Sequence, residues 1–188
     1  MENMITNEEV EIKVSLKNPE EVEKKLTEIA TFVKLKKQKD EYFVPAHNNF
    51  FAKTYVTEYL RIRSEEGKSC LEYHFCHRNN DGSSLKTDEH ELEVNDPQMA
   101  SVILKKLGMV NKVTIIKERK QFDYNDFEIV IDLVEGLGLY IEVEAKKLLG
   151  SHKETKDQCY QVLRELGAEW EETPELGYPE MLLKKSDN

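Results

Sequence analysis

The stretch that decides the fold is Glu9–Leu16, which reads Glu-Val-Glu-Ile-Lys-Val-Ser-Leu. Charged and apolar residues alternate with a period of two, which indicates a half-buried β-strand. The next residues, Asn18-Pro19-Glu20-Glu21, supply an N-cap, a proline at the first helical position and acidic side chains in the first turn. The sequence therefore predicts a strand followed at once by a helix, whose apolar stripe is Val22, Leu26 and Ile29.

The same signals predict two more helices and six more strands. One helix begins after Asp96-Pro97, with Val102, Ile103 and Leu107 as its stripe, and ends at Gly108. The other follows Ser151 and ends at Gly167. The predicted strands are Thr57–Ser64, Ser69–His77, Asp88–Val94, Val113–Phe122, Phe127–Val134 and Leu139–Glu144. This content predicts an α+β fold with a strongly curved or closed sheet, in a single domain that covers residues 1–188.

Composition excludes several classes of protein. The 188 residues carry 37 acidic against 27 basic side chains, and a net charge of -10 argues against a general nucleic-acid binder. No apolar run approaches the ~20 residues of a membrane helix, and Met1-Glu2-Asn3-Met4 lacks the pattern of a secretory signal. Cys70, Cys76 and Cys159 form neither a disulfide framework nor a zinc-binding spacing. We therefore expect a cytoplasmic protein with no nucleic-acid or membrane partner.

Alternate strand positions place charges of one sign in pairs. The opposite positions are apolar and include Leu92, Ile116 and Leu133. One interpretation is a sheet whose charged face lies in water. The other is a binding surface, because carboxylates at i and i+2 can share a divalent cation, and paired Arg or Lys side chains can bind phosphate oxygens. The charged face consists of Glu9, Glu11, Lys13, Arg61, Arg63, Glu89, Glu91, Glu93, Lys117, Arg119, Asp132, Glu142 and Glu144.

These residues resemble a known family. Glu9-Val10-Glu11-Ile12-Lys13 matches the ExExK signature of the CYTH domain, which is found in triphosphate tunnel metalloenzymes. Tyr178–Leu183 is similar to the tail of bacterial class IV adenylyl cyclases. The resemblance continues in order through Asp40-Glu41-Tyr42-Phe43, Leu60-Arg61-Ile62-Arg63, Glu91-Leu92-Glu93, Lys117-Glu118-Arg119, Asp132–Gly138 and Tyr140–Glu144.

The resemblance implies an eight-stranded antiparallel closed β-barrel that encloses a polar triphosphate tunnel, with helices around it. The tail, about residues 174–188, would pack on or near the tunnel mouth. The implied activity is metal-dependent and most like that of a class IV adenylate cyclase, which converts ATP to cyclic AMP and pyrophosphate. Two alternatives stay open: a triphosphatase acting on tripolyphosphate, thiamine triphosphate or a nucleoside triphosphate, and a non-catalytic module that binds polyphosphate or a nucleotide. The expected partner is a small-molecule triphosphate, and a homodimer is left open.

The resemblance also implies roles for individual residues. Lys13 and Tyr42 would be catalytic, although Tyr42 could equally be a packing aromatic beside Phe43. Mg²⁺ or Mn²⁺ would be held by Glu9, Glu11, Asp132, Glu142 and Glu144. The phosphate chain would be bound by Lys13, Arg61, Arg63, Lys117 and Arg119.

The chain departs from the family at two places. Leu71–His77 stands where the family shows a Leu-Thr-x-Lys-Gly strand, so His74 replaces a tunnel lysine. Thr87 and Asp88 stand where a basic residue is common, and Lys86 is the nearest substitute. We count His74 and Lys86 among the triphosphate-binding residues, with a neutral His74 bonded inside the sheet as the alternative. The loss of fixed positive charge should weaken triphosphate binding.

Overall fold

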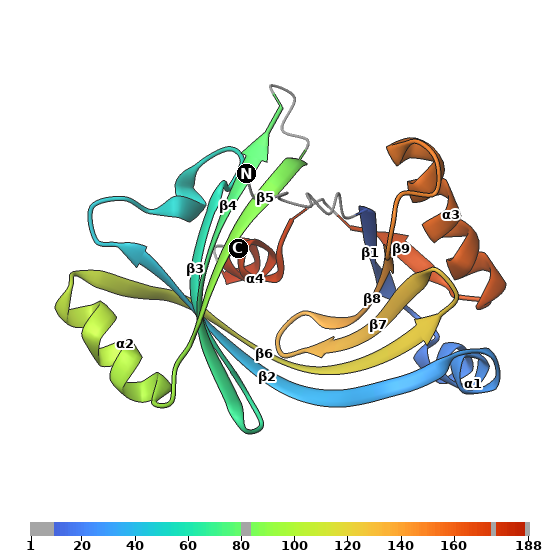
Figure 1. Cartoon of the computed structure of the whole chain (residues 1–188), viewed down its shortest axis with the longest axis horizontal. Coiled ribbons are helices and arrows are strands. Elements are labelled where there is room, and N and C mark those ends of the chain that lie inside the picture. The colour runs from blue at the N-terminus through green and yellow to red at the C-terminus, as the bar shows by residue number, and fades with distance from the viewer. Residues whose placement is uncertain (1–9, 80–83, 174–175, 187–188) are drawn as a thin grey trace, which may run out of the picture. The chain divides into compact units, whose positions relative to one another are not determined.

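The computed structural model describes residues 10–79, 84–173 and 176–186, which form two compact units (Figure 1). The first unit comprises Met1–Lys36 and Lys117–Leu176, and the second comprises Lys37–Ile116 and Gly177–Asn188. Glu9 and four residues of the predicted tail, 174–175 and 187–188, lie outside the described residues.

Among the residues that the structure describes, nine strands form one antiparallel sheet with the order β5-β4-β3-β2-β6-β7-β8-β1-β9. The α+β class is confirmed. The sheet differs from the expected eight-stranded closed barrel, because hydrogen bonds do not close it within the described part of the chain. Two of the nine strands, β2 and β9, were not among the seven predicted from the sequence: β2 has 15 residues, and β9 has three residues and pairs with β1 at one end of the order. The strands are β1 (Val10–Leu16), β2 (Thr31–Pro45), β3 (Glu58–Glu65), β4 (Lys68–Arg78), β5 (Ser84–Glu93), β6 (Met109–Tyr124), β7 (Phe127–Val134), β8 (Gly138–Ala145) and β9 (Trp170–Glu172).

In the described ranges four α-helices accompany the sheet: α1 (Pro19–Ile29), α2 (Pro97–Lys106), α3 (His152–Glu165) and α4 (Tyr178–Ser186). A short 3₁₀ helix, η1 (Phe50–Ala52), follows β2. The first three were predicted, and α4 lies in the segment expected only as a tail. None of the helices in the described residues is long and apolar enough to span a bilayer.

Local capping explains where the predicted helices begin. Asp96 caps α2 by accepting a hydrogen bond from the backbone N–H of Met99 at 2.8 Å, and Ser151 forms a capping box with Glu154 at the start of α3. The predicted N-cap of α1, Asn18, instead donates to the carbonyl of Gly167 and accepts from the N–H of Glu169. Asn18 therefore ties the start of α1 to the segment that follows α3.

The core of the first unit lies between its helices and the apolar face of its strands. Val22 and Leu26 of α1 are fully buried, which confirms the predicted stripe of that helix. Figure 1 shows α3 running beside β1 and β8, and its Leu163 is also fully buried. The strand residues in this cluster are Ile12, Val14, Ile129, Ile131, Ile141 and Val143. Since alternate side chains point to opposite faces, this packing leaves the charged positions on the other face.

The apolar positions outside that core behave differently. The predicted stripe of α2 is wrong as a core-facing surface, because Val102 and Ile103 are exposed and Leu107 is 74% exposed. The helix packs on β3 and β4 and buries Ser101 instead. Leu92, expected on an apolar face, is 63% exposed, and Ile116 and Leu133 are exposed too. Local periodicity predicts which side of α2 is apolar, but whether that side is buried depends on whether another element of the fold packs against it.

We expect Leu26→Ala to lower the free energy of unfolding by about 2–5 kcal/mol, because it opens a cavity in the core of the first unit. Leu107→Ala, at an exposed position, should change that free energy by less than about 0.5 kcal/mol. Urea unfolding followed by circular dichroism measures both variants. Equal losses would contradict the assignment of α1 to the core and α2 to the surface.

Candidate functional site

In the first unit, carboxylates from three strands share one face. Cross-strand register pairs Lys13 with Glu142 and Glu11 with Glu144 between β1 and β8. It pairs Arg119 with Asp132 between β6 and β7. Residues directly opposite each other in an antiparallel pair lie on the same face. The carboxylate cluster, as we call it, consists of Glu11, Asp132, Glu142 and Glu144.

Arg119 holds two members of the carboxylate cluster. Its Nε donates to Asp132 Oδ1 at 2.8 Å, and one terminal nitrogen donates to Asp132 Oδ2 at 2.5 Å and to Glu142 Oε2 at 2.6 Å. Asp132 is 0% exposed, and the buried amine of Lys117 lies 3.8 Å from its Oδ2. Charge-assisted, bidentate pairs of this kind are what allow a carboxylate to be buried as an anion. Arg119 therefore fixes the orientation of Asp132 and Glu142.

Lys13 contacts the segment that follows β9. Its Nζ donates to the carbonyl oxygen of Leu176 at 2.7 Å, and its own carbonyl oxygen accepts from Thr173 Oγ1 at 2.7 Å. These bonds tie β1 to the end of the first unit. Lys13 lies two residues from Glu11 on the same face of β1.

The second unit carries its own pair of guanidinium groups on β3. Arg63 forms a bidentate pair with Asp40, with both bonds at 2.8 Å. Arg61 donates from Nε to Glu72 Oε2 at 2.6 Å and from a terminal nitrogen to the hydroxyl of Tyr42 at 3.0 Å. Asp40 and Glu72 are both buried. Each arginine is therefore oriented by its own carboxylate.

Sequence reasoning did not assign roles to Asp40 and Glu72. Asp40 is part of the motif Asp40-Glu41-Tyr42-Phe43, and Glu72 lies two residues before His74 on the same predicted strand. The period of two along a strand could therefore have placed both carboxylates on the charged face. Their pairing with Arg63 and Arg61 depends on cross-strand register, which no local pattern reveals.

Tyr42 is buried against Arg61. Burial raises the pKa of its phenol above the ordinary value, although the nearby guanidinium opposes that shift. The hydroxyl is therefore protonated near neutral pH and can donate a hydrogen bond while it accepts one from Arg61. This environment suits stabilisation of a charged oxygen better than abstraction of a proton.

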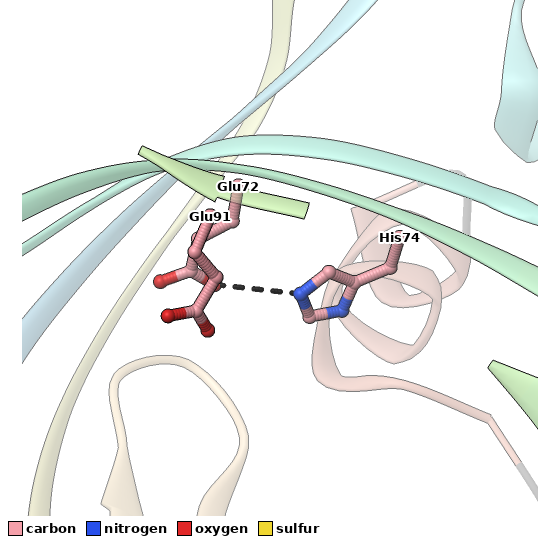
Figure 2. A group of neighbouring side chains, drawn as sticks. All are labelled: Glu72, His74 and Glu91. Carbon is pink, nitrogen blue, oxygen red and sulfur yellow. Dashed lines mark ion pairs between the residues drawn. The ribbon is translucent and has the colours of Figure 1, made fainter. Parts of the chain in front are cut away.

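His74 lies on the same face of the second unit as Arg61. Register places His74 opposite Glu89 and Glu72 opposite Glu91 between β4 and β5. Figure 2 shows the imidazole pointing toward Glu72 and Glu91, and one potential ligand atom from each of the three lies within 4.8 Å of the others. Burial, followed by the charge of Arg61, lowers the pKa of His74, while Glu89 and Glu72 oppose the shift. The imidazole is therefore neutral at pH 7.

Lys86 pairs with His77 in the register between β4 and β5. The backbone register therefore places Lys86 on the face of the sheet opposite to the one that carries His74, Glu89 and Glu91. Its side chain lies outside the described part of the chain.

A lowered pKa at His74 predicts a pH dependence of stability. Between the folded pKa and the ordinary value of 6.5, the unfolded chain binds more protons than the folded one, so stability falls as pH decreases through this range. From about pH 8 to about pH 5.5, in metal-free buffer, wild type should lose more unfolding free energy than His74→Gln. Urea titrations of both proteins at the two pH values give the difference directly. Equal losses would show that His74 titrates alike in both states.

The buried Arg119–Asp132 pair leads to a second prediction about stability. Asp132→Asn should destabilise the protein by about 3–5 kcal/mol, because Arg119 and Lys117 lose a buried counter-charge. Asp123→Asn on the same hairpin removes only an exposed ion pair with Lys146 and should cost less than about 1 kcal/mol. Denaturant unfolding checks both, and similar values would argue against a stabilising role for the buried pair.

Comparisons with known proteins agree with this arrangement. Residues 7–175 match the family model of the CYTH domain. A Methanocaldococcus jannaschii protein, named putative adenylate cyclase MJ0240, is 36% identical over 137 residues, which is 72% of this chain and 75% of that protein. The structure of PH1012 from Pyrococcus horikoshii superimposes with a TM-score of 0.71 at 25% identity, and the match covers 93% of this chain and 99% of that one.

A more distant structure shares the fold. The putative adenylyl cyclase HpAC1 from Hippeastrum, which has a dominant triphosphatase activity, superimposes with a TM-score of 0.69 at 19% identity. The match covers 94% of this chain and 96% of HpAC1. At this identity the likeness shows the fold alone.

Proposed function

The chain belongs to the CYTH domain family, and from that premise we propose that it catalyses metal-dependent conversion of ATP to cyclic AMP and pyrophosphate. The observation that carries the proposal is the ordered pairing of Arg61, Arg63 and Arg119 with buried carboxylates. Guanidinium groups held in a fixed orientation suit the binding of phosphate oxygens, and grouped carboxylates suit a divalent cation.

The carboxylate cluster fits Mg²⁺ or Mn²⁺. Its donors are all carboxylate oxygens, which hard divalent cations prefer, and they come from three adjacent strands of one unit. Glu9 would join it as the remaining acidic residue of the first motif. When bound, the metal would supply positive charge to the phosphate oxygens and to the leaving group. Arg119 positions Asp132 and Glu142 for this task.

The basic residues would bind the phosphate chain. Arg61 and Arg63 are each fixed by one carboxylate, so they lose little conformational freedom when a phosphate binds. Lys117 and Arg119 would do the same in the first unit, and Lys13 would add a further cation there. The hydrogen bonds from these donors become stronger as negative charge develops on the phosphate oxygens during the reaction.

In the proposed reaction the ribose 3′-oxygen attacks the α-phosphorus of ATP and pyrophosphate leaves. The name of the Methanocaldococcus jannaschii relative supports this assignment. Lys13 and Tyr42 would stabilise the charges that develop on the attacking and leaving oxygens. Tyr42 would do so as a protonated phenol, because its hydroxyl is buried and held by Arg61.

A triphosphatase is the second candidate. Here water attacks the terminal phosphorus, the bond from that phosphorus to the bridging oxygen breaks, and the remaining diphosphate (ADP from ATP, or pyrophosphate from tripolyphosphate) leaves, so that orthophosphate is released as the second product. The environment of Tyr42 supports this candidate as well, since a phenol held by Arg61 is a suitable hydrogen-bond donor to the departing diphosphate oxygen. The phosphate-binding residues are the same in both reactions, so only the products distinguish them.

Product analysis decides between the candidates. We expect purified protein with ATP and Mn²⁺ to release cyclic AMP and pyrophosphate in equal amounts. Orthophosphate release from ATP or from inorganic triphosphate would instead assign the triphosphatase. Tight binding of triphosphate without any product would assign a binding module and would overturn the enzymatic proposal.

A conservative variant tests the guanidinium pair. Arg63→Lys keeps the charge beside Asp40 but removes the bidentate geometry, so kcat/KM should fall about ten- to a hundredfold, as expected for one charge-assisted contact. Arg164→Lys, at an exposed position on α3, should leave kcat/KM unchanged. Steady-state kinetics measure both. Indistinguishable values would remove Arg63 from the site.

A further inference from the structure

The charged face of the second unit has more negative than positive groups. On this face, among the described residues of β2 to β5 up to the register shift after His77, three cations (Arg61, Arg63 and Lys68) stand against six carboxylates (Asp40, Glu65, Glu72, Glu89, Glu91 and Glu93). Asp40 and Glu72 are compensated by the arginines that contact them. Glu91 makes no ion pair with any residue of the described ranges, and Glu89 lies 3.7 Å from a nitrogen of His74. This excess of carboxylates favours a cation near His74.

The nitrogen of His74 that points toward Glu72 lacks a hydrogen bond. Its Nε2 is buried, lies 3.7 Å from Glu72 Oε2 and has no hydrogen-bond partner among residues 10–79, 84–173 and 176–186. A buried polar atom without a partner is rare in proteins and calls for an explanation. An imidazole nitrogen in this position is a potential metal ligand, since metals bind its neutral form.

Glu72 can bind a metal ion with one carboxylate oxygen while the other oxygen contacts Arg61. It is 3% exposed, and within the described chain its contacts with Arg61 use Oε2 alone. The other oxygen is available for a metal while the guanidinium fixes the orientation of the carboxylate, as outer-shell partners commonly do. Glu91 lies across the strand pair from Glu72, and its exposed side chain can adjust to an ion.

We propose that Glu72, His74 and Glu91 form a binding site for a divalent transition-metal ion, such as Zn²⁺ or Co²⁺ (Figure 2). Ligand atoms at about 2.0–2.2 Å from one ion lie about 3–4 Å apart, so the atoms of this trio, already within 4.8 Å, need only small rotations. One imidazole and two carboxylates suit Zn²⁺ or Co²⁺ better than Mg²⁺, which prefers oxygen ligands alone.

This site is separate in composition from the carboxylate cluster, and its existence does not rest on the proposed function. It would nevertheless bear on that function. An ion at His74 supplies fixed positive charge at the position where the family resemblance implies a lysine, beside Arg61 on the same face. The substitution of lysine by histidine would then exchange a permanent cation for a bound one.

Side-chain NMR tests the site without any triphosphate. Zn²⁺ is added to the full chain in buffer with excess Mg²⁺, and the ¹⁵N resonances of the five histidines are followed. We expect one imidazole to show the large shift of a coordinated nitrogen, and this signal to be absent from His74→Gln. Zn²⁺ binding measured by calorimetry should weaken at least tenfold in His74→Gln and in Glu91→Gln.

His77→Gln is the matched control, because His77 pairs with Asp88 at 2.6 Å on the opposite alternation of β4 and should leave Zn²⁺ affinity unchanged. Glu91→Gln changes an exposed side chain, so it keeps the test valid even if His74→Gln fails to fold. An unshifted His74 imidazole at saturating Zn²⁺, or unchanged affinity in Glu91→Gln, would overturn the proposal. If the wild-type protein binds Zn²⁺ as expected but converts neither ATP nor inorganic triphosphate, that result would count against the proposed function alone.

Discussion

The rest of the structure depends on buried pairs of arginine and carboxylate side chains. Several strands of the sheet, such as β1 and β3, carry alternating charged positions, and burying such charges is strongly unfavourable unless they are paired and hydrogen-bonded. Arg119 with Asp132 in one unit, and Arg63 with Asp40 in the other, meet this requirement with bidentate bonds. Because the charges are paired within the sheet, the apolar face of β1, β7 and β8 can pack on α1 and α3.

The same pairs prepare the candidate site. A guanidinium that is already oriented by a carboxylate needs less ordering when a phosphate arrives, and a carboxylate that is already oriented by Arg119 needs less ordering when a metal arrives. Pairing also keeps opposite charges together in the unliganded protein. The interactions that stabilise the fold and those that would bind a metal–triphosphate complex are therefore made by one set of side chains.

Local signals in the sequence predicted much of this fold. Alternation in β1 and the N-terminal signals at Pro19, Asp96 and Ser151 depend on neighbouring residues, so the structure agrees with them. Periodicity also identified the apolar side of α2, but could not tell what covers it, and Leu107 is exposed. Open strand order, the short strand β9, and the pairing of Glu72 with Arg61 depend on contacts between distant residues, which a local pattern does not contain.

The position of β1 has a consequence for synthesis of the chain on the ribosome. Val10 pairs with Ala145 and Leu16 with Trp170, so the first strand of the first unit finds its neighbours only after most of the polypeptide has been made. Until then its alternating apolar side chains lack the helix and strands that cover them, and loop closure over this separation slows folding. During translation the nascent chain therefore carries an unpaired apolar strand, which is the kind of surface that makes folding intermediates prone to aggregation.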